Sequence, residues 1–91
     1  MRYLYKPSFL RTLRSFDRPR QLKAEHAINA LLDYFQSGRR TEGLGLKQLR
    51  KPYWEIRVGL DTRIMFLLEG DLVSFLIVGD HNDIRRYLKH V

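Results

Sequence analysis

The sequence predicts an α+β fold in the order β-α-α-β-β-β-β-α, with a mainly antiparallel sheet, a two-helix layer on one face and a short C-terminal helix. Three observations lead to this prediction. The stretch Tyr53–Tyr87 contains one alternating strand and two nearly continuous apolar runs, separated by tight turn signals. Apolar residues before it recur at helical spacing. The length of 91 residues is near the size at which one core is just sufficient, so residues 1–91 are expected to form a single domain.

The first part of the chain predicts one strand and two helices. Arg2–Tyr5 is short and rich in tyrosine, which suits a strand. Ser8 is placed to cap a first helix over Ser8–Phe16. Asp17, followed by a first-turn proline, predicts the start of a second helix, and Gly38 is placed to end it in a left-handed C-cap. The apolar stripe of this second helix comprises Ala24, Ala27, Ile28, Leu31, Leu32 and Phe35.

The remaining residues predict four strands and a last helix. The strands are expected at Leu46–Leu49, Tyr53–Leu60, Thr62–Glu69 and Leu72–Val78. Gly70-Asp71 is a hairpin signal because it lies between two apolar runs. Asn82 or Asp83 is expected to cap a short helix that carries Ile84, Tyr87 and Leu88 on one side.

Two arginines frame the first predicted hairpin. If its turn is centred on Leu60, then Arg57 and Arg63 lie directly opposite each other on one face of the sheet. Such partners have Cβ atoms ~4.5–5.5 Å apart, and like charges there destabilise a hairpin. An anion bound between them would explain the arrangement, whereas a slip of one residue would move Arg63 to the other face.

The charge balance favours a polyanionic partner. There are 17 basic and 10 acidic residues, the net charge is +7 and the sequence pI is about 10.1. Nucleic acid is the first expectation, then an acidic protein, then an anionic membrane. The chain has no cysteine, and its three histidines do not fall at metal-ligand spacing, so neither a metal site nor another cofactor is expected. No signal peptide or long apolar segment is visible, so a cytoplasmic location without membrane contact is expected.

Several short motifs carry a family resemblance. They are a helical pair after a first strand, the strands W-E-I-R-V-G and T-R-I-M-F, and the ending V-G-D-H-N-D-I-R-R-Y. Together they cover the chain from Met1 to about Leu88. The sequence resembles the RelE/ParE toxin superfamily of bacterial toxin–antitoxin modules, and within it the RelE-like messenger-RNA endonucleases.

The resemblance implies a single RelE/ParE-like toxin domain that cleaves messenger RNA without a metal or cofactor, often on the ribosome. It also implies a cognate antitoxin that wraps the toxin, and contact with DNA only through the complex with that antitoxin. We expect the antitoxin to carry an acidic segment. An amphipathic helix of it could dock where Leu31 or Leu32 is left uncovered, unless the stripe is wholly buried within the domain.

The resemblance also implies roles for individual residues. Arg57 falls where the family has a basic residue on the long central strand, and Arg63 falls on its phosphate-binding arginine. His81 matches the proton donor, and Tyr87 matches an aromatic residue that stacks on the substrate. Some members carry a lysine where this chain has Glu55, which leaves the identity of the base open. Further phosphate contacts are expected from Lys47, Arg50, Lys51, Arg85 and Arg86.

The chemistry of RNA cleavage agrees with these residue types. Attack by the 2′-hydroxyl needs a base, cations for the charge on the phosphorane and an acid for the leaving 5′-oxygen. Arg57 and Arg63 can supply charge, and His81 can move a proton at neutral pH. Each residue also has an ordinary alternative: a solvated strand face for Glu55 and Arg57, a loop residue at position 81, and core packing for Tyr87.

Two other functions stay open at the level of sequence. One is a ParE-like poison that binds DNA gyrase without catalysis. The other is a catalytically inactive basic module that serves as a DNA co-repressor with its antitoxin. The feature that separates the enzyme from the gyrase poison is the coincidence of Arg57, Arg63 and His81, which a pure binder has no need to assemble.

Overall fold

The computed structural model describes all 91 residues, Met1–Val91, and confirms the predicted fold class and element order. The strands are β1 (Arg2–Tyr5), β2 (Lys47–Gln48), β3 (Tyr53–Val58), β4 (Thr62–Glu69) and β5 (Leu72–Gly79). The helices are α1 (Pro7–Arg14), α2 (Arg18–Ser37) and α3 (His81–Lys89). The strands form one five-stranded sheet in the order β1-β5-β4-β3-β2, in which only the β1–β5 pair is parallel. None of the helices has the combination of length and apolar character that a membrane span requires.

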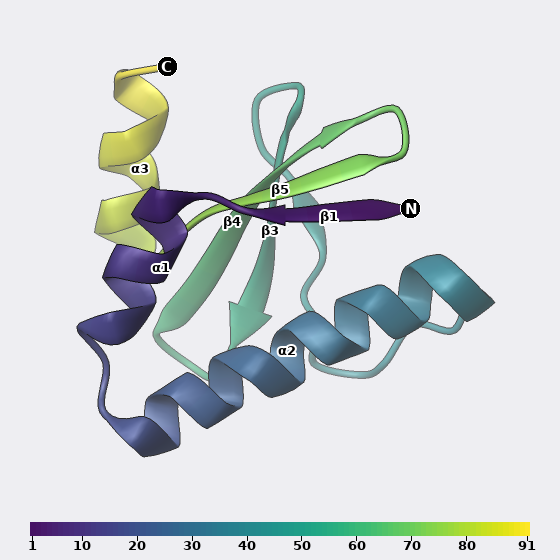
Figure 1. Ribbon diagram of the computed structural model, residues 1–91, viewed down its shortest axis with the longest axis horizontal. Helices are drawn as coiled ribbons and strands as arrows, with labels where there is room; N and C mark the ends of the chain where they lie inside the picture. Colours follow the sequence, from purple (N-terminus) through teal and green to yellow (C-terminus); the bar gives the residue numbers. More distant parts are fainter.

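Helices cover both faces of the sheet (Figure 1). On one face, α1 and α2 contribute Phe9, Ala24, Ile28 and Leu31 to a core shared with alternate residues of β3, β4 and β5. On the other face, Ile84 of α3 packs with Met65, Leu76 and Ile77. The sheet is therefore the middle layer, and α3 covers only part of its second face, where the side chains of Arg57 and Arg63 also project.

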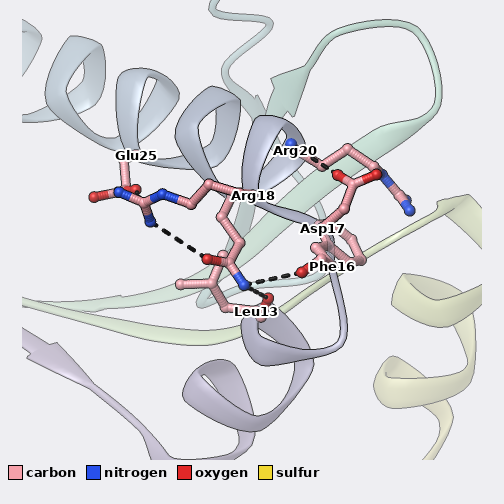
Figure 2. A network of polar contacts seen from close by, with 7 residues as sticks. Leu13, Phe16, Asp17, Arg18, Arg20 and Glu25 are labelled. Atoms are coloured by element: carbon pink, nitrogen blue, oxygen red, sulfur yellow. Dashed lines mark hydrogen bonds and ion pairs between the residues drawn. The ribbon is translucent and has the colours of Figure 1, made fainter.

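The connection between α1 and α2 is stabilised by side chains at the start of α2 (Figure 2). The Gln21 amide donates to the carbonyl oxygens of Leu13 at 3.2 Å and Phe16 at 2.9 Å, which satisfies backbone groups at the end of α1. Asp17 caps α2 as predicted, accepting from the Arg20 N–H at 3.0 Å. The Arg20 guanidinium lies 4.0 Å from the centre of the Phe16 ring. This network fixes the angle at which α2 leaves α1.

Two predicted helix starts were wrong. The helix α1 begins at Pro7, and the Ser8 hydroxyl donates to the carbonyl oxygen of Leu76 at 2.6 Å instead of capping the helix. The cap of α3 is Asp80, not Asn82 or Asp83. Asp80 accepts from the Asp83 N–H at 2.8 Å while Asp83 accepts from the Asp80 N–H at 2.9 Å, which is a reciprocal capping box. The reason in both cases is that a tertiary or reciprocal contact decides which of several polar residues caps the helix.

The two predicted hairpins are confirmed. Gly59 has φ +72° in the turn after β3, and Val58 pairs with Thr62, so Arg57 lies directly opposite Arg63. The β4–β5 turn consists of Gly70, with φ +60°, and Asp71. Of the two leucines of the α2 stripe that could be left uncovered, Leu32 is half-buried, whereas Leu31 is fully buried.

Candidate functional site

The site is organised around the cross-strand arginine pair. Arg57 is exposed, whereas the side chain of Arg63 keeps only 16% of its surface in contact with solvent. The Nε atom of Arg63 lies 3.3 Å from Oε2 of Glu55. The Nη1 atom of the same guanidinium is buried and has no hydrogen-bond partner. A buried N–H donor without a partner is costly, and its burial also closes this atom to a ligand in this conformation.

Glu55 is itself a buried residue. Its side chain is 9% exposed, and its carboxylate forms the ion pair with Arg63 described above. The register places Lys47 of β2 and Met65 of β4 on either side of it, on the same face of the sheet. Because its carboxylate is engaged in this pair, Glu55 compensates the charge of Arg63 and orients its guanidinium.

His81 and Arg63 meet at a surface hollow. The hollow has a volume of about 410 Å³ and is lined by Leu60, Asp61, Arg63, Asp80, His81 and Asn82. His81 is the first residue of α3 and is exposed. In the β4–β5 register Arg63 lies opposite Gly79, which has no side chain to cover it. The strand-to-helix junction therefore presents an imidazole and a guanidinium to the same small open space.

Gly79 is required at that junction. A Cβ atom at this position would lie 2.5 Å from Oδ2 of Asp83, which is closer than real Cβ contacts come. The space is filled by the capping box, in which the pKa of Asp83 is lowered, first by the N–H of Asp80 and further by hydrogen bonding to Arg86. The positive end of the α3 dipole is thus already neutralised by the carboxylates of the chain itself.

Tyr87 does not join this hollow. It lines a separate one of about 590 Å³ between α1, β5 and α3, together with Thr12, Phe16 and His90 among others. It also packs against the Met65 and Ile84 cluster. In this conformation, core packing accounts for the position of Tyr87.

The predicted phosphate-binding residues are dispersed. Arg50 donates from Nη2 to the carbonyl oxygens of Leu88 at 3.0 Å and Val91 at 3.1 Å, so its guanidinium is occupied at the end of α3. Arg86 pairs with Asp83 at 3.1 Å. The side chains of Lys47, Lys51 and Arg85 are exposed, and Lys47 shares its face of the sheet with Glu55.

The sequence reading missed Asp61 and Asp80 as lining residues of the hollow. The sequence analysis singles out neither residue as a site candidate. Asp61 precedes Arg63 by two residues, and the pairing of Arg63 with Gly79 brings the two strand ends together. A prediction of this β4–β5 register would have placed Asp61 and Asp80 at the same hollow. No group of three or more histidine, aspartate or glutamate side chains is arranged to hold a metal ion.

Comparison with known proteins identifies the fold. No protein-family model matches the sequence, and no curated protein matches it. Solved structures do match. A RelB–RelE antitoxin–toxin complex from Methanococcus jannaschii aligns with 92% of this chain and 96% of that chain, at 21% identity and a TM-score of 0.68. The E. coli DinJ–YafQ toxin–antitoxin complex aligns with 90% of this chain and 93% of that chain, at 17% identity and a TM-score of 0.70.

A third structure, the YoeB/ParE toxin from Agrobacterium tumefaciens, aligns with 89% of this chain and 99% of that chain, at 15% identity and a TM-score of 0.67. These likenesses cover nearly the whole length of both partners in each comparison. The resemblance suggested by the sequence motifs is confirmed at the level of structure: the chain has the fold of the RelE/ParE toxins.

Proposed function

We propose that this chain is the toxin of a type II toxin–antitoxin module and that it acts as an endoribonuclease on messenger RNA. The observation that carries the proposal is that Arg63, paired with Arg57 across the β3–β4 hairpin, lines the same surface hollow as His81. The shared fold with proteins named as toxins supports the toxin role. A pure binder has no need to bring a guanidinium and an imidazole to the same hollow.

The proposed reaction is attack of a 2′-hydroxyl on the adjacent phosphate. Arg63 and Arg57 bind non-bridging phosphate oxygens and stabilise the charge that develops on the phosphorane. Glu55 holds the Arg63 guanidinium in place. His81 donates a proton to the 5′-oxygen as the bond from phosphorus to that oxygen breaks. The products are a 2′,3′-cyclic phosphate and a 5′-hydroxyl.

The experiment is cleavage of messenger RNA, free and on ribosomes, by the purified protein. We expect cyclic-phosphate ends, full activity in EDTA and no cleavage where the sugar is 2′-deoxy. His81→Ala should lower the rate by about 10²–10⁴-fold, the usual contribution of a general acid. His26→Ala is the matched control, because His26 is an exposed histidine on α2 far from the hollow in sequence. If RNA stays intact under every condition and the protein traps DNA gyrase instead, the chain is a gyrase poison and not a ribonuclease.

The same proposal includes an acidic antitoxin as partner. The solved RelB–RelE and DinJ–YafQ structures are complexes with antitoxins. Exposed apolar side chains on β1, α1 and α2 support a protein partner here, namely Leu4, Tyr5, Leu10 and Leu22. The net charge of +7 favours an acidic one. Expression with the neighbouring small reading frame should recover a complex whose association rate falls as salt is raised.

A further inference from the structure

The proposed reaction needs a group that accepts the proton of the 2′-hydroxyl, and the positions of the carboxylates identify it. This inference rests on the proposed ribonuclease function. Glu55 is buried against Arg63 at 3.3 Å. Asp80 accepts from the Asp83 N–H at 2.8 Å, and Asp83 accepts from Asp80 and Arg86. These three carboxylates are all engaged in contacts that hold the fold together.

Asp61 is different from all three. It lies in the turn between β3 and β4, is exposed, and its carboxylate makes no hydrogen bond or ion pair. It lines the same hollow of about 410 Å³ as Arg63 and His81. Besides Asp61, the charged and titratable groups that line this hollow are Arg63 from β4, Asp80 at the N-cap of α3 and His81 from α3 itself. A phosphate bound by Arg63 in this hollow would therefore have a carboxylate from the turn and an imidazole from the helix beside it.

We propose that Asp61 is the general base of the reaction and that His81 is its general acid. The Asp61 carboxylate takes the proton of the 2′-hydroxyl as the O2′–P bond forms. The P–O5′ bond breaks, and the imidazolium of His81 gives its proton to O5′. One proton is taken up and one is released by the protein, and no redox partner is involved. Turn residues are suited to this role because they are solvent-accessible and are positioned by the two strands that they join.

The negative charge of a carboxylate beside a phosphate opposes RNA binding. The effect of a substitution on RNA affinity therefore distinguishes a general base from a residue that binds RNA. Asp61→Asn removes the proton acceptor and this repulsion together. The expected result is a single-turnover cleavage rate lower by about 10²–10⁴-fold with RNA affinity equal to or tighter than that of the wild type. A residue that only maintained the turn would change both quantities in the same unfavourable direction.

The test measures single-turnover cleavage by wild type, Asp61→Asn, Asp61→Glu and Asp33→Asn. Asp33 is an exposed aspartate on α2 and provides the matched control. The wild-type rate should fall at low pH, where the base is protonated, and again at high pH, where the acid has lost its proton. The low-pH fall should vanish in Asp61→Asn and return in part in Asp61→Glu. Thermal unfolding confirms that each variant is folded across the pH range used.

A second substrate distinguishes base from acid. RNA with sulfur in place of O5′ at the cut site has a leaving group that needs no proton, because a thiol is far more acidic than an alcohol. This substrate should restore cleavage to His81→Ala and leave Asp61→Asn slow. Wild-type rates for Asp61→Asn, or rescue of that variant by the sulfur substrate, would overturn the role of Asp61 while leaving the ribonuclease function intact. Failure of the wild-type protein to cleave any RNA would overturn both.

Discussion

The two arginines that face each other across the β3–β4 hairpin should respond to substitution with opposite signs. Arg57 is exposed and makes no ion pair, so its principal interaction is repulsion from the like charge across the strand. Arg63 is largely buried and compensates the carboxylate of Glu55 at 3.3 Å. Arg63→Ala would leave that carboxylate buried without a cation, whereas Arg57→Ala would only relieve repulsion.

The magnitudes follow from burial. Removing one partner of a buried ion pair typically costs about 3–5 kcal/mol, and the residual exposure of 16% and 9% here places Arg63→Ala near the lower end, about 3 kcal/mol. At roughly 4–8 °C per kcal/mol for a domain of this size, Tm should fall by about 12–24 °C. Arg57→Ala should stabilise the fold by about 0.2–1 kcal/mol, the usual range for a cross-strand pair.

The measurement is urea and thermal unfolding of Arg57→Ala, Arg63→Ala, Glu55→Ala and the Glu55/Arg63 double variant. The double variant removes both charges, so its loss should be smaller than the sum of the two single losses by about 2–3 kcal/mol. Equal stability of Arg57→Ala and Arg63→Ala, or additive losses in the cycle, would refute the reasoning. Unchanged m-values would show that the denatured state is not responsible.

Three further predictions concern the junction with α3 and its far end. Gly79→Ala should destabilise the domain and slow RNA cleavage, because the added methyl overlaps the Asp83 carboxylate that closes the capping box; unfolding and cleavage assays together check this. The Asp80 N–H lowers the pKa of Asp83 from its ordinary value of 3.8. The ionised Asp83 carboxylate therefore stabilises the folded state above pH 3.8, and this stabilisation is lost as the pH falls through the lowered pKa. The stability difference between wild type and Asp83→Asn should therefore be largest near neutral pH and shrink below about pH 4; a pH-independent difference would contradict it. Arg50→Ala should release the carbonyl oxygens of Leu88 and Val91 and cost about 0.5–1.5 kcal/mol, with faster amide hydrogen exchange confined to the last turn of α3.

The fold was predictable because its signals are local. Period-two alternation placed β3, apolar runs placed β4 and β5, and a capping aspartate with a C-terminal glycine bounded α2. The cross-strand pairing of Arg57 with Arg63 was expected if the turn was centred on Leu60, and the observed register confirms it. These features need only neighbours in sequence.

The sequence by itself determined the fold class and indicated the arginine pair, and its motifs led to the family whose fold the chain has. Only the tertiary structure decided how those parts combine into a site. It buried Glu55 beside Arg63, turned Tyr87 toward α1, used Arg50 to hold the end of α3, and brought Asp61 to the hollow that contains His81. The physical reason is that burial and ion pairing depend on contacts between residues far apart in the chain, which residue type and spacing do not encode.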